Sequence, residues 1–338
     1  MTNQKVTSHD VARHAGVSQS AVSRYFTPGG SVSKKKAELI QAAADELGYR
    51  PNVLARSMIT GRSKIIGLVV AYFENQFYPE VLELMSVGLQ AKGYHVLVFM
   101  ASRTVGDVEP IVQEMLDYQV DGIVMLSVSM SSTLAEQCAS QGIPVMLFNR
   151  DQADDRLSSV TSENGLGGEL AAELLVKGGY ERIAYLAGFE GASTQILREQ
   201  GFLKGLKVAG KSLFAREVGN FHYDQAAAAA RRLFERDIKP DAVFVSNDHM
   251  AFAAMDIIRH ECQLSIPGDV AVVGFDDVPI AAWPSFDLTT IRQDVHTMVD
   301  TTINGLLDTI EGRVSEPSKV RIPVTLVERG STRPLPTR

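Results

Sequence analysis

Four polar side chains lie close together near the start of the chain, where residues 19–24 read Gln-Ser-Ala-Val-Ser-Arg. If this segment is helical, Ala21 and Val22 point inward and the polar side chains remain outside. These side chains carry amide, hydroxyl and guanidinium groups, which donate and accept hydrogen bonds. They belong to Gln19, Ser20, Ser23 and Arg24. The segment therefore offers a small polar face to a hydrogen-bonding partner.

The residue patterns give little support to enzyme chemistry. The glycine cluster at positions 165–168 does not have the GxGxxG spacing, and no serine lies in a GxSxG motif. The seven histidines show no metal-ligand spacing. Asp276 and Asp277 follow an expected strand, where paired carboxylates either bind a cation or cap the next turn. We expect no catalysis, no cofactor and no metal.

Charge is unevenly distributed along the chain. Residues 1–64 contain ten lysines and arginines and four acidic residues, whereas the whole chain has a formal net charge of −7. A basic segment joined to an acidic body fits a domain that binds a polyanion beside a domain with another task. A solvated basic surface is the alternative that charge alone leaves open.

Length and composition indicate a small module joined to one large or two medium domains. The chain has 338 residues and is 45% hydrophobic, which is enough to bury a substantial core. Its longest apolar runs are far shorter than the roughly 20 residues that cross a bilayer. Polar residues at 7–10 replace the apolar core of a secretory signal, so we expect a cytoplasmic protein. Cys138 and Cys262 lack a CxxC partner and are expected to be buried thiols.

The first 50 residues have the pattern of three short helices. Gly16 is expected to make the turn between the first two, which gives a helix-turn-helix. The expected N-terminal caps are Thr7 or Ser8, Ser18 and Ser33, and the second and third helices are expected over 19–25 and 34–47. Gly48 then ends the third helix.

Residues 51–61 form a separate short segment. Pro51 and Gly61 bracket at most two helical turns, and so short a helix is marginal in isolation. The segment either folds when DNA or a partner subunit packs against it or serves as a simple tether.

After Lys64 the pattern alternates apolar strands with longer helices, as in parallel sheets covered by helices. The expected strands are 65–70, 95–100, 122–126, 144–148, 182–187, 242–246 and 270–275, and the expected helices are 78–90, 108–118, 132–141, 165–177, 195–206, 223–235, 250–261 and 296–311. These strands are too many for one compact sheet, which indicates two similar lobes. Ligands of open parallel sheets bind beyond the carboxyl ends of the strands, so the cleft between the lobes is the expected site.

Several motifs in order along the chain resemble one family. Residues 6–24, VTSHDVARHAGVSQSAVSR, resemble the head of the lactose-repressor (LacI) family. Further matching segments are Val32-Ser33, Leu47-Gly48-Tyr49, Pro51-Asn52, Ala55-Arg56, Ile66-Gly67, Asp121-Gly122-Ile123, Ser246-Asn247-Asp248, Val273-Gly274-Phe275-Asp276-Asp277 and Leu288-Thr289-Thr290-Ile291-Arg292-Gln293. The resemblance covers essentially the whole chain. It implies a ligand-responsive repressor of carbohydrate or related catabolic genes.

The resemblance also implies an organisation. A small all-α helix-turn-helix head precedes an α/β sensor with the two-lobed fold of periplasmic sugar-binding proteins. The implied parts are the head 1–50, a hinge helix 51–61, an N-terminal lobe 62–161 with 292–321, and a C-terminal lobe 162–291 with 322–338. The protein is expected to bind a near-palindromic operator as a homodimer, because one head makes too few contacts alone. A ligand between the lobes then changes operator affinity by shifting a population.

By matching position, the second helix of the head enters the major groove. Gln19 and Ser20 are then the specificity residues, Ser23 contacts a phosphate or base edge, and Arg24 makes a bidentate contact with guanine. Ala21 replaces a threonine that is frequent in the family. The full expected DNA-binding set is Thr7, Ser18, Gln19, Ser20, Ser23, Arg24, Ser33, Asn52, Ala55 and Met58. Met58 matches the residue that wedges into the minor groove, with packing between hinge helices as the alternative.

In the sensor, Arg198 and Asp248 match the pair that grips the hydroxyl groups of a ligand. A guanidinium and a carboxylate supply the donors and acceptors that a polyol needs. Without the resemblance, Asp248 reads as a helix N-cap. The remaining expected ligand-binding residues are Tyr72, Phe73, Asn75, Phe77, Ser127, Asn149, Phe221, Asp276 and Gln293. Asn149 replaces a frequent aspartate, and the missing negative charge favours a ligand more acidic than a neutral sugar. The effector that Arg198 and Asp248 can grip is expected to be a sugar or a sugar acid.

Two further side chains have open interpretations. Arg150 meets either an anionic ligand group or a nearby Asp151 or Asp154. Trp283 is expected to cover the lobe crossover, with ligand stacking as the alternative. The rival functions are a cytoplasmic or transport-related sugar-binding protein, which the basic head disfavours, and a sugar-modifying enzyme, for which no catalytic pattern is found.

Overall fold

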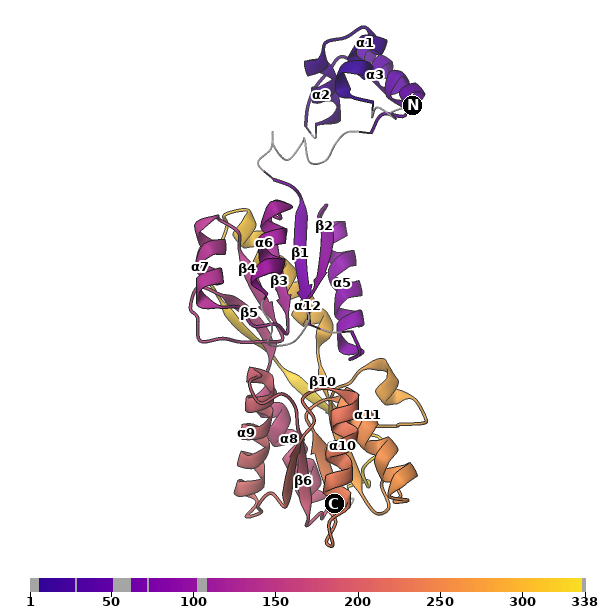
Figure 1. Ribbon diagram of the computed structural model, residues 1–338, viewed down its shortest axis with the longest axis vertical. Coiled ribbons are helices and arrows are strands. Elements are labelled where there is room, and N and C mark those ends of the chain that lie inside the picture. The colour runs from indigo at the N-terminus through magenta and orange to yellow at the C-terminus, as the bar shows by residue number, and fades with distance from the viewer. Residues whose placement is uncertain (1–5, 28, 51–61, 72, 102–107, 336–338) are drawn as a thin grey trace. The chain divides into compact units, whose positions relative to one another are not determined.

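The computed structural model describes residues 6–27, 29–50, 62–71, 73–101 and 108–335. The chain forms two compact units, Met1–Lys64 and Ile65–Arg338 (Figure 1). Four of the residues predicted above to contact DNA or ligand lie outside the described residues. They are Asn52, Ala55, Met58 and Tyr72.

The first unit is the predicted helix-turn-helix. Its helices are α1 (Ser8–Ala15), α2 (Gln19–Phe26) and α3 (Lys34–Leu47). Thr7, rather than Ser8, caps α1, in a capping box with Asp10, and Gly16 makes the turn in a left-handed conformation with φ of 63°. The small core includes Val11 and Val22, both fully buried.

The cap of α3 differs from the prediction. Ser33 occupies the N-cap position in an extended conformation, but its side chain makes no capping hydrogen bond. The start of this helix therefore leaves its N–H groups for other partners.

The second unit contains two six-stranded sheets. The first has the order β11 (Lys319–Ile322), β5 (Ser158–Ser162), β4 (Val145–Phe148), β3 (Gly122–Leu126), β1 (Ile65–Val70) and β2 (His95–Met100). The second has the order β12 (Val324–Val327), β10 (Thr289–Gln293), β9 (Ala271–Asp276), β8 (Ala242–Val245), β6 (Ile183–Ala187) and β7 (Ala215–Val218). All recorded pairings are parallel except that of β10 with β12, which is antiparallel. The predicted two-sheet α/β fold is confirmed.

Helices flank both sheets (Figure 1). Helices α5 (Phe77–Ala91), α6 (Glu109–Asp117) and α7 (Ser132–Ser140) follow strands of the first sheet, and α9 (Ser193–Val208), α10 (Tyr223–Phe234) and α11 (Asp248–Asp256) follow strands of the second. Helix α8 (Asn164–Lys177) follows β5 of the first sheet but packs against β8, β10 and β12 of the second. The late helix α12 (Val295–Ile310) returns to the first sheet and packs against α5, β4 and β5. Strands β11 and β12 follow one another in sequence but belong to different sheets. The chain therefore crosses from the first sheet to the second between these two strands.

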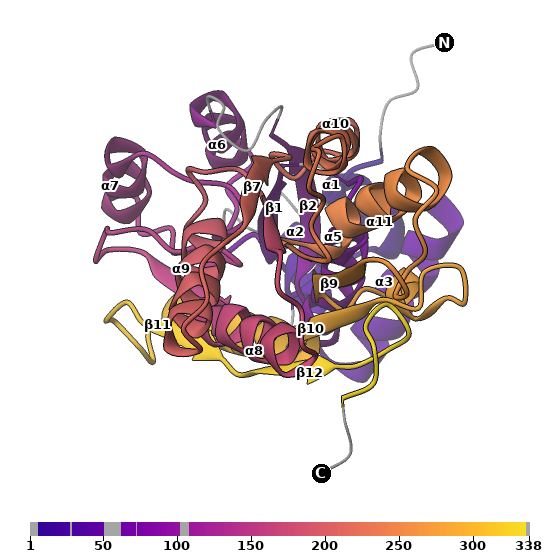
Figure 2. The same ribbon diagram turned by 90° about the horizontal axis from the view of Figure 1, so that it is seen from below.

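Helices α8 and α9 lie side by side in unusually close contact (Figure 2). A Cβ atom on Gly201 of α9 would overlap the carbonyl oxygen of Gly165 of α8. Likewise, a Cβ atom on Gly168 would overlap the carbonyl oxygen of Arg198. The missing side chains therefore allow the two backbones to meet, and this contact holds the helix that carries Arg198.

Replacing Gly201 with alanine should force α8 and α9 apart. Backbone atoms cannot rotate away as a flexible side chain can, so we expect a loss of about 1 to 3 kcal/mol in the free energy of unfolding. Urea denaturation would measure it. Gly165→Ala is the matched control, because its Cβ atom would lie 3.9 Å from its nearest neighbour, the Leu197 carbonyl oxygen. That variant should be neutral or more stable by up to about 1 kcal/mol, since alanine favours helices. Equal stabilities of the two variants would contradict the close packing.

Candidate functional site

The polar face predicted on the second helix of the head is present. Ala21 and Val22 are buried, whereas Gln19, Ser20 and Arg24 are exposed. Ser23, on the same helix, is partly exposed. Helix α2 begins at its N-cap Ser18, whose side chain accepts a hydrogen bond from the Ala21 N–H. The exposed polar residues thus stand on the first two turns of a capped helix.

Hydrogen bonds orient several of these side chains. Nε2 of Gln19 donates to Oγ of Ser8 at 3.3 Å. Nε of Arg24 donates to the carbonyl oxygen of Ser20 at 3.3 Å, one helical turn earlier. The hydroxyl oxygens of Ser18 and Ser20 lie 3.0 Å apart. The face is therefore partly ordered within the head itself.

The start of α3 adds a second polar feature to the head. Lys34, Lys35 and Lys36 form its exposed first turn, directly after the exposed Ser33. A helix N-terminus with uncapped N–H groups and nearby cations attracts anions such as phosphate. This feature fits the predicted backbone contact of Ser33.

In the sensor, Arg198 lies in a buried polar cluster. Its side chain is 2% exposed and donates through Nε to Oδ1 of Asn164 at 2.8 Å. NH1 donates to the carbonyl oxygen of Ser246 at 2.5 Å and lies 3.7 Å from Oδ1 of Asp276. The guanidinium group also stacks 3.5 Å from the centroid of the Phe275 ring. Burial lowers the pKa of Arg198, and the charge of Asp276 opposes that shift.

Asp276 connects residues from both sheets. Its Oδ1 accepts a hydrogen bond from Nε2 of Gln293 at 2.7 Å, and its carboxylate also accepts one from the side chain of Asn75. Asn75 follows β1 of the first sheet, whereas Asp276 and Gln293 end strands of the second. Oγ of Ser162, the last residue of β5, donates to Oε1 of Gln293 at 2.5 Å. Carboxyl ends of strands from both sheets therefore meet at these side chains.

Asp248 is not the N-cap of its helix, the role expected for it without the family resemblance. The N-cap of α11 is Asn247, whose Oδ1 accepts from the Met250 N–H at 3.0 Å. Asp248 is the first helical residue and is fully buried. Its Oδ1 accepts from the Thr290 hydroxyl at 2.6 Å and its Oδ2 from the Val278 N–H at 3.0 Å. The ion-pair partner of Arg198 is Asp276, because the Asp248 carboxylate is already engaged with the strand and turn beside it.

Burial raises the pKa of Asp248, and the neighbouring charge of Asp276 raises it further. Because the folded protein holds this proton more tightly than the unfolded chain does, its contribution to stability declines as pH rises from about 4 through the raised pKa. Asp248→Asn keeps an oxygen acceptor and removes the titration. We therefore expect the free energy of unfolding to fall less between about pH 4 and pH 8 in Asp248→Asn than in the wild type.

Urea denaturation at a series of pH values measures that difference. The control is Asp269→Asn, because hydrogen bonds from Ser265 lower the pKa of this carboxyl below its ordinary value. Its stabilising contribution is lost only as pH falls toward that lowered pKa, so the control should keep the wild-type slope over this range. Identical slopes for Asp248→Asn and the wild type would contradict the buried titration.

On the first sheet, two predicted residues lie together at adjacent strand ends. Ser127 follows β3 and Asn149 follows β4, and each has a left-handed backbone, with φ of 55° and 54°. Nδ2 of Asn149 lies 3.4 Å from Oγ of Ser127, and both side chains are buried. NH2 of the buried Arg150 donates to the Ser127 carbonyl oxygen at 2.8 Å. Of the two acids considered for Arg150, Asp154 pairs with Arg156 at 2.8 Å.

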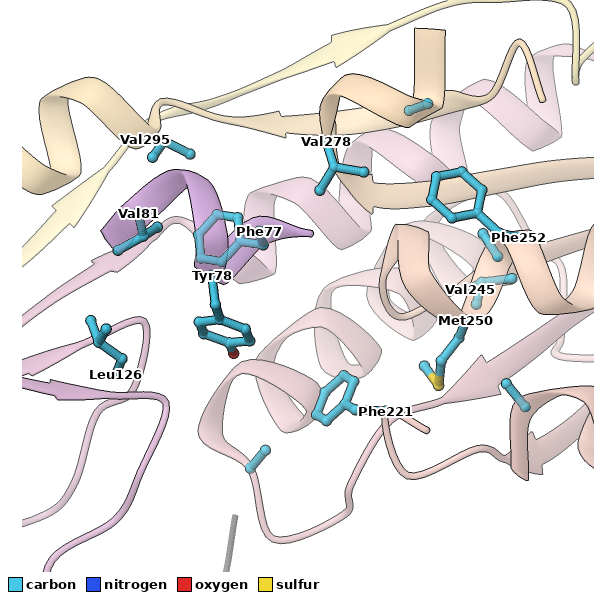
Figure 3. Packing of buried hydrophobic residues seen from close by; sticks show 14 of the residues in the cluster. Phe77, Tyr78, Val81, Leu126, Phe221, Val245, Met250, Phe252, Val278 and Val295 are labelled. Carbon is cyan, nitrogen blue, oxygen red and sulfur yellow. The ribbon is translucent and has the colours of Figure 1, made fainter. Parts of the chain in front are cut away.

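The predicted aromatic residues fall into different environments. Phe77, predicted to face the ligand, is buried in the hydrophobic core beside Tyr78 (Figure 3). Its ring also lies 6.3 Å from that of Phe148, and it begins a helix whose inner face covers the sheet. Phe221 is buried in the same hydrophobic cluster, on the second-sheet side. Phe73 is 40% exposed, so of these three it alone remains open to solvent.

Three other expectations need correction or completion. Trp283, expected to cover the crossover, is 56% exposed. The carboxylate of Asp277 forms ion pairs rather than a turn cap or a cation site. Its Oδ2 lies 2.6 Å from Nε of Arg292, and its Oδ1 lies 2.6 Å from NH2 of Arg329. Cys138 is buried and Cys262 partly buried, and both are free thiols. Among the described residues no group of acidic, histidine or cysteine side chains could hold a metal ion.

Sequence reasoning did not single out the groups that hold Arg198 in place. Asn164 and Ser246 supply the acceptors, from the start of α8 and from the residue after β8. Asn164 is nearly fully buried, which is unusual for an amide side chain. The signal for it in the sequence was slight: a polar residue immediately before the glycine-rich start of a predicted helix.

Comparison with known proteins relates both units to one family. Residues 7–52 match the family described as bacterial regulatory proteins, lacI family, and residues 172–332 match a periplasmic binding protein-like domain. The HTH-type transcriptional regulator CelR of Thermobifida fusca is 31% identical over 337 residues, which are 97% of this chain and 98% of that protein. In the described residues, no helix is long and apolar enough to span a membrane.

Solved structures agree with this relationship. A lac repressor dimer bound to operator and the anti-inducer ONPF has a TM-score of 0.85 and 28% identity, and the match covers 97% of this chain and 99% of that one. A complex of the transcriptional regulator CelR with cellobiose has a TM-score of 0.73 and 29% identity, with 97% of this chain and 100% of the other covered. The chain belongs to the lacI family of bacterial regulatory proteins, which are ligand-responsive transcription regulators that bind operator DNA.

Proposed function

We propose that this protein represses carbohydrate or related catabolic genes, and that a sugar or sugar acid controls its binding to the operator. The observation that carries the effector site is the buried cluster of Arg198, Asp276, Gln293 and Asn75, to which both sheets contribute. Its guanidinium, carboxylate and amide groups suit a ligand with several hydroxyl groups. The relative that was solved with cellobiose supports a carbohydrate effector. The protein would act in the cytoplasm, where its operator lies.

The proposed effector site also includes residues at the strand ends of the first sheet. Ser127 and Asn149 present hydroxyl and amide groups there, and the exposed Phe73 offers an aromatic face. The proposed mechanism is a shift between two arrangements of the lobes, of which the effector favours one. The lobes we assign are 62–161 with 292–321 and 162–291 with 322–338, joined to a head at 1–50 through a hinge at 51–61. The change of sheet between β11 and β12 supports the last boundary.

In the head, the proposed base-reading residues are Gln19, Ser20 and Arg24, on the exposed face of α2. Ser23 and Ser33 would bind phosphates, together with Thr7 and Ser18 at the starts of the first two helices. The operator-bound dimer of the lac repressor supports this arrangement on a near-palindromic site.

A mobility-shift assay with DNA from upstream of the gene tests the proposal. The full-length protein should bind one segment specifically and more weakly as salt rises, because phosphate contacts release counterions. Thermal denaturation with a panel of sugars, sugar acids and nucleobases then identifies the effector, since a bound ligand raises stability by mass action. The effector that stabilises the protein should also change operator affinity. Salt-insensitive or wholly nonspecific DNA binding would overturn the proposal.

A further inference from the structure

The hydroxyl of Ser8 is free of any capping role in its own helix. Helix α1 is capped by Thr7, whose hydroxyl oxygen lies 3.4 Å from the Asp10 N–H and whose own N–H donates to Oδ2 of Asp10 at 3.0 Å. This reciprocal pair satisfies the capping box completely. Ser8 is the next residue and contributes no bond to it. Its side chain is therefore available for another task.

Gln19 likewise has no capping role at the start of its own helix. Ser18 is the N-cap of α2, and its side chain accepts the hydrogen bond from Ala21 N–H. Gln19 is exposed and reaches across eleven positions of sequence, so that its Nε2 donates to Ser8 Oγ at 3.3 Å. The bond therefore links the first residue of one helix to the first residue of the next.

We infer that Ser8 is a positioning residue for base recognition by Gln19. This inference rests on the proposed binding of operator DNA through α2. A glutamine reads adenine with both ends of its amide, since the oxygen accepts from N6 and the nitrogen donates to N7. The bond to Ser8 uses one of the two Nε2 hydrogens and leaves the oxygen and the other hydrogen.

The bond also restricts the rotation of a long side chain before DNA is bound. A free glutamine loses much of its rotamer freedom when it is ordered, and ordering it beforehand reduces that loss on binding. The benefit is realised only on the base pair that Gln19 reads. A phosphate contact by Ser8 would instead strengthen binding to every sequence.

The experiment begins with the full-length wild-type protein and a library of duplexes with randomised half-sites. Binding constants are then measured for the selected duplex and for versions with each base pair replaced in turn. Ser8→Ala should lose about threefold to fivefold in discrimination at a single base pair of each half-site, as expected for one neutral hydrogen bond. Gln19→Ala should lose discrimination at the same pair. Ser8→Thr, which keeps the hydroxyl, should restore it.

The double variant Ser8→Ala/Gln19→Ala distinguishes positioning from direct contact. If Ser8 acts through Gln19, the double variant discriminates no worse than Gln19→Ala alone. Additive losses, or a uniform loss on all sequences, would overturn the inference. Ser31→Ala, which removes another exposed hydroxyl of the head, is the control for a general effect and should match the wild type. If the wild-type protein selects no sequence at all, the proposed function fails instead; if it selects one and Ser8→Ala is unaltered, only this inference fails.

Discussion

Arg24→Ala is expected to lower discrimination between the operator and altered operators by about tenfold to a hundredfold. The bond from Nε to the Ser20 carbonyl directs the guanidinium along the exposed face of α2 and leaves its terminal nitrogens for the two acceptors of a guanine. Such a bidentate contact is worth about 1 to 3 kcal/mol. Titration of labelled duplexes that differ at one base pair would measure the change.

Two control variants separate recognition from charge. Arg24→Lys keeps the positive charge but loses the planar fork, so it should retain affinity for DNA in general and lose most of the discrimination. Arg13→Ala removes a charge from the same unit, where Arg13 lies exposed and 3.6 Å from Asp10. It should weaken binding slightly on all sequences and leave discrimination unchanged. Discrimination retained in Arg24→Ala, or lost equally in Arg13→Ala, would contradict the proposed contact.

The head could be predicted well because its signals are local. Cap residues, the turn glycine and an apolar stripe at helical spacing all lie within a few positions of the elements that they determine. The one difference was Ser33, which has the right position and backbone conformation without the capping bond. A hydroxyl that has competing partners cannot be assigned from its neighbours in sequence.

The sheets were predicted in part. The seven strands expected from apolar runs are present, but β5, β7, β10, β11 and β12 were missed. Strand β5 reads Ser-Ser-Val-Thr-Ser and β11 Lys-Val-Arg-Ile, so neither shows the continuous apolar run that marks a buried parallel strand. The position of each strand depends on pairing partners far away in sequence, as β11 pairs with β5 through Lys319 and Ser159.

The effector cluster shows the same division between local and distant causes. Asn247 and Asp248 are both good capping residues, and the residue that does not cap, Asp248, accepts a hydrogen bond from Thr290, 42 positions away in sequence. Gly274, on β9, gives the Asp248 carboxylate its room, because a side chain there would overlap it. Position along the chain therefore identified this region of the sensor, but it did not indicate that Asp276 is the carboxylate that pairs with Arg198.

Asp276→Asn is expected to abolish the response to the effector while operator binding without effector persists. Asp276 is the carboxylate beside Arg198, and it also accepts from Gln293 and Asn75, so a ligand that enters the cluster must exchange hydrogen bonds with it. Loss of its charge removes a charge-assisted acceptor, which is worth about 1.5 to 3 kcal/mol, or roughly tenfold to a hundredfold in effector affinity. Calorimetric titration with the effector found by thermal denaturation measures the loss.

Asp248→Asn makes the same aspartate-to-asparagine change at the neighbouring carboxylate. In this variant the response to the effector should persist. Both Asp248 oxygens are engaged inside the lobe, by Thr290 and by the Val278 N–H, and an asparagine can keep both bonds if the Thr290 hydroxyl reverses its direction. Effector affinity should then stay within about threefold of the wild type, because no ligand contact is removed. If Asp248→Asn loses the response and Asp276→Asn keeps it, the effector is held by the carboxylate that sequence position indicated, and the cluster around Arg198 is structural. If both variants lose it, the two acids act as one coupled unit, and the charge of the pair rather than either contact would control the effector.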